Sequence, residues 1–339
     1  MTAGPGTRRP PANVDTDVSH RGVAAVIAGL LVLVLGVGLG IAWLGKKGFN
    51  PLPAPEQCTA HAGESTVVLD LEQARNAAII AGVAVRRGLP ARAVTIALAT
   101  AYQESHIRNL DHGDRDSLGL FQQRPSMGWG TAQQIRDPHY AAGQFYEALV
   151  KIRNYQTLPI TVAADKVQRS AFPKAYADHE TDARVLASAL TGYSPAAFSC
   201  VTRHGNLARE PLGRNGLTKR ADVVRRDLLA TFGKLPTGGY RPGGVSAGHM
   251  EGSAHYEGRA VDVFLRPVNQ VNKRRGWAYA QYLVASAAER NIQTVIFDDH
   301  IWTAGSEDGW QPYTAPRRAG NPDTLRHLDH VHVDVVRGD

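Results

Sequence analysis

One glutamate in this 339-residue sequence occupies a position that suits acid catalysis. Glu104 closes the proline-free stretch 91–105, in which Val94, Leu98 and Ala101 recur at helical spacing and predict one buried stripe. A carboxyl at the edge of such a stripe is partly shielded from water, and shielding favours the protonated form. A protonated carboxyl can donate to the oxygen of a glycosidic bond as that bond breaks. The simpler alternative is an ordinary surface glutamate at a helix end.

A second set of candidate residues lies in the last third of the chain. In the stretch 330–335, HVHVDV, strict alternation predicts a strand with His330, His332 and Asp334 on one face and valines on the other. If the strand around Asp262 is its neighbour, then His255, Asp262 and His332 converge. Two imidazoles and one carboxylate form a catalytic type of zinc site, with one position left open for water. The alternative is a polar strand face next to a turn histidine.

The segment around Glu104 resembles a known family. Glu104-Ser105, followed after a polar loop by SLGLFQ at 117–122, is similar to the lytic transglycosylase and goose-type lysozyme superfamily, and to lysozyme-like domains of actinobacterial envelope proteins. The resemblance covers about residues 70–200. It implies a mostly helical domain with Glu104 as the catalytic acid and Ser117 and Gln122 as sugar contacts. Tyr193 is a further candidate for sugar binding, with core packing as an equal alternative.

The type of glycan cleavage stays open at this point. A hydrolytic lysozyme usually needs a second carboxylate, and Asp111, Asp114 and Asp116 are all available in the loop. The transglycosylases that the segment resembles need none, because a hydroxyl of the substrate attacks. We favour the transglycosylase reaction.

The histidine motifs resemble the zinc-dependent D-alanyl-D-alanine carboxypeptidase and dipeptidase group over residues 237–337. The signature Ser-x-His-x-x-Gly-x-Ala-x-Asp is matched by Ser253, His255, Gly258, Ala260 and Asp262. The resemblance implies zinc held by His255, Asp262 and His332, and substrate held by Arg241 of a Gly-Tyr-Arg segment. One departure is that Asp329 stands where the carboxypeptidases carry a glutamate base. His330 or His327 could serve as the base instead, as in relatives that end in His-x-His.

An apolar run near the N-terminus sets the expected organisation of the chain. Residues 23–44 are 22 uncharged, mostly apolar residues, long enough to span a bilayer. We therefore expect a single-pass membrane protein with its N-terminus in the cytoplasm and its globular domains outside. The expected parts are a disordered tail (1–22), a transmembrane helix (23–45), a linker (46–65), a mostly α lysozyme-like domain (66–200), a connecting loop and helix (201–235) and an α+β zinc domain (236–339).

Charge and cysteine content agree with this location. The net charge of +7 suits nucleic acid, a membrane surface or an acidic polymer such as a bacterial wall. We interpret the basic helix expected at 218–232 as a solvated connecting helix, so no nucleic-acid partner is predicted. Cys58 and Cys200 flank one domain-sized stretch and predict a disulfide in an exported protein.

Together these patterns predict a membrane-anchored enzyme that remodels peptidoglycan. Glu104 would cleave the glycan strand, and the zinc domain would cleave or bind the stem peptide. The alternative is a non-catalytic protein that binds the wall or acts as a scaffold.

Overall fold

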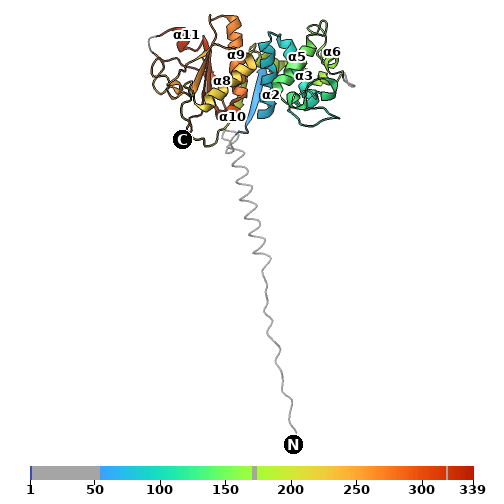
Figure 1. Ribbon diagram of the computed structural model, residues 1–339, viewed down its shortest axis with the longest axis horizontal. Helices are drawn as coiled ribbons and strands as arrows, with labels where there is room; N and C mark the ends of the chain where they lie inside the picture. The colour runs from blue at the N-terminus through green and yellow to red at the C-terminus, as the bar shows by residue number, and fades with distance from the viewer. Residues whose placement is uncertain (2–53, 170–173, 318–319) are drawn as a thin grey trace. The chain divides into compact units, whose positions relative to one another are not determined.

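The structure is a computed structural model that describes Met1 and residues 54–169, 174–317 and 320–339. Its described part is an α+β fold (Figure 1). The helices of the first half are α2 (Leu71–Arg86), α3 (Ala91–Ser105), α4 (Ala132–Ile135), α5 (Pro138–Leu149), α6 (Ile160–Gln168) and α7 (Glu180–Leu190), with short 3-10 turns η1 (Pro125–Met127) and η2 (Ala175–His179).

Local signals explain where the two central helices begin and end. The Asp70 carboxylate accepts a hydrogen bond from the backbone of Gln73, whose side chain accepts one from the backbone of Asp70, so that a capping box starts α2. Helix α3 follows Pro90 and ends at Ser105. The next residue, His106, caps it in a left-handed backbone conformation (φ 52°). The bounds of α3 are those that the sequence predicted.

A small antiparallel sheet flanks these helices. Its order is β2-β1-β3, with β1 at Gln57–Ala62, β2 at Ser65–Leu69 and β3 at Phe198–Val201. Cys58 and Cys200 are directly opposite each other in the β1–β3 register and form a disulfide, which confirms the predicted pairing. Strand β1 lies within the segment 46–65 that we expected to be a linker.

The second half of the chain forms a six-stranded antiparallel sheet of order β4-β5-β9-β6-β7-β8. The strands are β4 (Thr237–Gly238), β5 (Ala260–Phe264), β6 (Ile292–Phe297), β7 (His300–Thr303), β8 (Gln311–Pro312) and β9 (His330–Val335). The helices are α8 (Lys219–Phe232), α9 (Gln270–Ala285), α10 (Ala287–Arg290) and α11 (Pro322–Leu325), with the 3-10 turn η3 (Ala254–Glu257). Val331, Val333 and Val335 are buried, as the alternation in β9 predicted.

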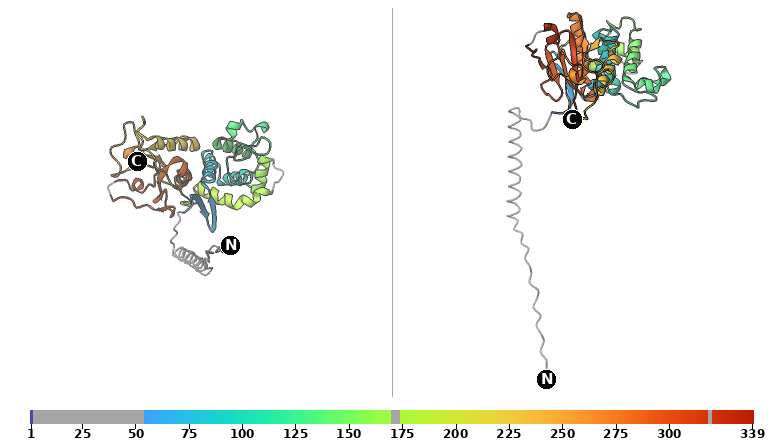
Figure 2. Two further views of the ribbon diagram at one scale, coloured as in Figure 1. Left: turned by 90° about the horizontal axis from the view of Figure 1, so that it is seen from below. Right: turned by 60° about the vertical axis from the view of Figure 1, so that its left-hand side comes forward.

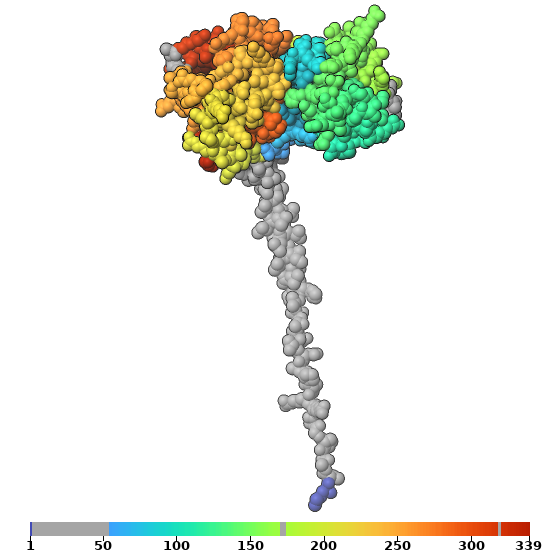
Figure 3. All heavy atoms as spheres, viewed as in Figure 1, coloured from blue at the N-terminus to red at the C-terminus, as the bar shows by residue number. Residues whose placement is uncertain are grey.

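Helix α2 lies between the two halves. The views agree that the blue-to-cyan α2 separates the green helices from the yellow-to-red elements (Figures 1, 2 and 3), and α2 contacts α5 on one side and α8 and α9 on the other. Gly82 permits the close approach to α8, since a Cβ there would lie 2.4 Å from the Thr231 side chain. Residues Pro55–Asp339 therefore form one compact unit.

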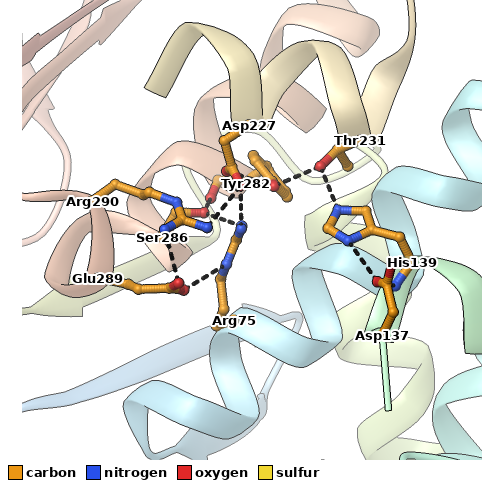
Figure 4. Close-up of polar contacts among 9 residues, drawn as sticks. All are labelled: Arg75, Asp137, His139, Asp227, Thr231, Tyr282, Ser286, Glu289 and Arg290. Carbon is orange, nitrogen blue, oxygen red and sulfur yellow. Dashed lines mark hydrogen bonds and ion pairs between the residues drawn. The ribbon is translucent and has the colours of Figure 1, made fainter. Parts of the chain in front are cut away.

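A buried polar network holds this junction together (Figure 4). The Arg75 guanidinium of α2 donates to Asp227 of α8 at 2.6 Å, to Ser286 at 2.7 Å and to Glu289 at 3.1 Å. Tyr282 of α9 donates to the other oxygen of Asp227 at 2.8 Å. Because the side chains of Arg75 and Asp227 are each 9% exposed, the pair is shielded from water and competing ions.

The fold class predicted from the sequence needs a correction. The part expected to be mostly helical carries the β2-β1-β3 sheet and shares one core with the second sheet, so the described chain is α+β throughout. The strands were missed because they are short, and because β3 pairs with β1 across more than a hundred residues, a pairing that no local period marks.

The predicted single-pass membrane location is also corrected. Among the residues that the structure describes, none of the helices combines the length and the apolar character needed to cross a bilayer. The apolar run 23–44 on which the prediction rested lies outside the described residues, as do residues 2–22 of the predicted tail and 46–53 of the predicted linker.

Arg75 provides a test of the junction. Arg75→Ala removes one partner of a buried, hydrogen-bonded ion pair, whereas Asp227 keeps Arg290 at 3.0 Å and Tyr282 at 2.8 Å, so we expect the free energy of unfolding to fall by about 3 kcal/mol. Denaturant titration followed by circular dichroism measures the change. Arg87→Ala, which breaks the exposed pair with Glu147 at the end of the same helix, is the matched control and should cost less than about 1 kcal/mol. Equal losses in the two variants would contradict the assigned role of Arg75.

Candidate functional site

The pairing of β5 with β9 brings the predicted metal ligands together. Asp262 of β5 lies directly opposite His332 of β9 in the antiparallel register. His255 comes from the turn η3, where the Ser253 hydroxyl accepts a hydrogen bond from the His255 backbone N–H. All three ligand side chains are buried, with 3% of His255, 5% of Asp262 and 8% of His332 exposed.

The three donor atoms form a nearly equilateral triangle. His255 Nε2 is 3.1 Å from His332 Nδ1 and 3.2 Å from Asp262 Oδ1, and His332 Nδ1 is 3.1 Å from the same oxygen. Zinc held tetrahedrally at 2.0–2.1 Å separates its ligand atoms by about 3.3 Å. The donor set therefore fits zinc in both chemistry and spacing, before any adjustment of the side chains.

The other ring nitrogen of each histidine has an acceptor next to it. His255 Nδ1 lies 2.7 Å from the carbonyl oxygen of Gly239, and His332 Nε2 lies 3.4 Å from Asp334 Oδ2. Because both partners can only accept, each holds a ring proton on the outward nitrogen, so the inward nitrogen can carry either a second proton, donated to Asp262, or a metal ion. Gly239 is needed for this approach: its φ is +79°, and a Cβ would lie 2.3 Å from the His255 ring.

The electrostatics of the triangle favour a charged carboxylate. Burial acts to raise the pKa of Asp262, but hydrogen bonds from His255 and His332 outweigh it and hold the pKa well below its usual value. For His332, burial acts to lower the pKa, while Asp262 and Asp334 raise it to about 9. The cluster thus attracts positive charge, whether a proton or a cation.

His330 and Asp329 form a dyad beside the triangle. Asp329 is buried, and its Oδ1 accepts a hydrogen bond from His330 Nδ1 at 2.7 Å, while its Oδ2 accepts from Arg266 at 2.8 Å and from Thr324 at 3.1 Å. Burial acts to raise the pKa of Asp329, but these donors lower it to about 2. Since Asp329 can only accept, the His330 proton is on Nδ1, and its Nε2 is free to take another.

A cavity of about 730 Å³ opens over these residues. Its lining includes His255, Asp262 and His332 together with His327, His330 and Arg266. His327 has a buried Nδ1 without a hydrogen-bond partner among the described residues, and burial, reinforced by His330 and His332, lowers its pKa to about 3. A neutral His327 faces the same space as His330.

Arg241, predicted to hold substrate, lies elsewhere in its loop. Its guanidinium donates to the Gly244 carbonyl at 3.0 Å and to the Ser246 hydroxyl at 3.2 Å. Two other arginines, Arg259 and Arg266, line the cavity, and sequence reasoning missed both. The Gly-Tyr-Arg segment does contribute to the site, but through the carbonyl of Gly239 rather than through its arginine.

The structure places Glu104 in the last turn of α3, half-buried. The Tyr176 hydroxyl of η2 donates to its carboxylate at 2.8 Å. The neighbouring Ser105 is buried and donates to the Leu120 carbonyl at 2.8 Å, which ties the helix end to the SLGLFQ segment. Tyr176 was not predicted, because only the packing of η2 and α3 brings the two residues together.

The other predicted sugar contacts have different surroundings. Ser117 is buried, and the Gln122 amide donates within its own loop, to the carbonyls of His112 and Gly119. The Arg274 guanidinium lies over the Tyr193 ring, 4.7 Å from the centre of that ring. Tyr193 also lines a hollow with residues of α9, and this hollow is separate from the metal cavity.

The three candidate second carboxylates lie in the loop after α3. Asp116 accepts hydrogen bonds from Arg124 at 2.7 Å and from the backbone of Ser126 at 2.8 Å, which lower its pKa. Asp111 is exposed and bonded to His112, and Asp114 is exposed. These contacts give Asp116 a role in holding the loop. They do not show which of the three aspartates would act as the second carboxylate beside Glu104.

Comparison with known families gives a match in the second half of the chain. Residues 213–325 match a family described as VldE, C-terminal domain. The matched stretch is less than half of the chain; it includes His255 and Asp262 and ends before His332. No curated protein matches the chain.

The donor triangle predicts one tightly bound zinc ion per chain. Replacing His255 or His332 by alanine should lower the zinc affinity at least a hundredfold, and Asp334→Asn should lower it about tenfold to a hundredfold by releasing the His332 ring. Competition with a chelating dye measures the affinity, and elemental analysis measures the stoichiometry.

His300→Ala is the control for nonspecific loss of a histidine, since His300 bonds the Asp298 carbonyl and does not line the cavity. Unchanged zinc binding by the His255 and His332 variants would show that the triangle does not hold the metal.

Proposed function

We propose that this protein is a zinc-dependent hydrolase that cleaves an amide bond in the stem peptide of peptidoglycan. The observation that carries the proposal is the triangle of His255, Asp262 and His332, in which each histidine has its other nitrogen bonded to an acceptor. Structural zinc sites use four protein ligands, whereas three ligands at a cavity leave a position for water and substrate.

Zinc bound there would act as a Lewis acid toward the substrate carbonyl and make a nearby water more acidic. The protein residues then have separate tasks. His330 accepts a proton at Nε2, which lies 3.9 Å from Asp262 Oδ1 and so beside the triangle. Asp329 orients the His330 ring and stabilises its charged form, and Arg266 in turn holds Asp329. His330 is thus the proposed general base. Asp329, whose side chain is shorter than the glutamate base of the carboxypeptidases, supports it.

The substrate class rests on the resemblance of the Ser253–Asp262 motif to D-alanyl-D-alanine carboxypeptidases and on the basic charge of the chain. A net charge of +7 favours association with an anionic polymer such as peptidoglycan. A wall-binding protein without activity would share this charge, so activity must be measured directly.

A second activity, cleavage of the glycan strand through Glu104, is supported by its placement. A half-buried carboxyl held by the Tyr176 hydroxyl at the end of α3 has a defined orientation and some access to solvent. We propose Glu104 as the general acid of a lytic transglycosylase or muramidase reaction on the same polymer.

For the zinc site, we expect His330→Gln to lower the rate of peptide release from purified peptidoglycan by about a hundredfold or more while zinc binding persists. Mass spectrometry of the soluble fragments measures the trimmed peptides. The control is His300→Gln, which should release them at the wild-type rate. If the His330 variant also does so, His330 is not the base.

For the glycan activity, Glu104→Gln should abolish the release of short glycan fragments and leave peptide trimming unchanged. Fragments with anhydro ends would identify the transglycosylase reaction, and reducing ends would identify hydrolysis. Glu64→Gln, at an exposed glutamate in the β1–β2 turn, is the control. A wild-type protein that binds peptidoglycan without releasing either kind of fragment would favour the wall-binding alternative.

A further inference from the structure

A second hollow, of about 530 Å³, borders the metal cavity. Phe264, the last residue of β5, and Arg266 line both spaces. The remaining lining residues come from the loop before β4, from the end of β5 and from α9: Lys234, Leu235, Pro236, Leu265, Asn272, Arg275 and Tyr279. We call this space the β5 hollow. A molecule that occupies the cavity could extend into it past Phe264 and Arg266.

The charged side chains that line the β5 hollow are all positive. Lys234, Arg266 and Arg275 line it, and none of the other described residues in its lining is an aspartate or glutamate. Within the part of the chain that the structure describes, Lys234 and Arg275 form no ion pair, whereas Arg259, which lines the metal cavity, is bonded to Glu257 at 2.7 Å. Arg266 is paired with Asp329, so Lys234 and Arg275 give the concave site an excess of positive charge, which a bound anion would neutralise.

Arg266 connects the two spaces structurally. Its Nε and Nη2 each lie 2.8 Å from Asp329 Oδ2, and its guanidinium carbon lies 4.5 Å from the centre of the Phe264 ring. Although these contacts hold the planar group, 56% of the side chain is exposed. A guanidinium has five N–H donors in a fixed fork, so donors remain for a carboxylate after Asp329 is bound.

We propose that the β5 hollow binds a carboxylate carried by the substrate beyond the bond that is cleaved, through Lys234, Arg266 and Arg275. This inference rests on the proposed hydrolase function, because the substrate must reach the hollow from the cavity. The ligand class is an acidic peptide. Its carboxylate could be a free chain end or an acidic side chain, and the two sources share the chemistry that the hollow recognises.

The test is calorimetric binding of two pairs of probes. The first pair is N-acetyl-alanyl-glutamate amide and its glutamine counterpart, and the second is N-acetyl-alanyl-alanine and its amide. We expect the acidic member of one pair to bind about tenfold more tightly than its neutral partner, since a charge-assisted contact at a half-exposed site contributes roughly one factor of ten. The preference should weaken as salt is raised.

The decisive variant is the double change Lys234→Gln and Arg275→Gln, at exposed positions where folding should be unaffected. It should remove the preference for the acidic probe. Arg274→Gln is the matched control, since it removes the adjacent arginine of α9, which lies over Tyr193 outside the hollow. Measuring with zinc and after chelation separates the two proposals: a preference that persists without zinc supports the hollow even if no hydrolysis is found.

Equal affinities for acidic and neutral probes of both pairs, or a preference that survives the double change, would overturn the inference. If the glutamate pair alone is discriminated, the hollow binds an acidic side chain. If the alanine pair alone is discriminated, it binds a chain end.

Discussion

The register between β5 and β9 is the constraint on which the candidate metal site depends. Opposite residues on one face of an antiparallel pair are the closest neighbours in a sheet, and this register makes Asp262 and His332 opposite residues. A slip of one residue would turn the histidines of β9 into the core and expose its valines. Burial of Val331 and Val333 against the helices therefore keeps the ligands in place. The same alternation of residues places the valines of β9 on its apolar face and the histidines on the face that lines the cavity.

Around the triangle, acceptors assign the position of each proton. The Gly239 carbonyl and the Asp334 carboxylate accept from the outward nitrogens of the two ligand histidines. The Asp329 carboxylate accepts from Nδ1 of His330. Neutral imidazoles would otherwise exchange tautomers and lose the lone pair that a metal or a proton requires. Oxygen acceptors placed outside the donor set therefore prepare three imidazoles for different tasks. Two of them suit metal binding, and the third suits proton transfer.

The core that joins the two halves makes them a single structural unit. Arg75 provides a buried charge from α2, and Gln281 of α9 donates to the Ala189 carbonyl at 2.6 Å and accepts from the Phe198 backbone at 2.7 Å. These polar contacts are specific in direction, so they define how α2, α9 and β3 meet, whereas the surrounding alanines and aromatics contribute mainly burial. The region of Glu104 and the metal cavity thus belong to the same compact unit, Pro55–Asp339.

The sequence was sufficient for features with local signals. The helix near 91–105 and the alternation of β9 were both predictable because each follows from a short period. The contacts of Glu104 with Tyr176, the position of Arg266 in the cavity and the β2-β1-β3 sheet were not. The first two join residues far apart in the chain, as does the β1–β3 pairing within the sheet, and a pairing between distant segments leaves no period in either one. Long-range packing alone sets these distances, since the free energy that stabilises them comes from burial across the whole core.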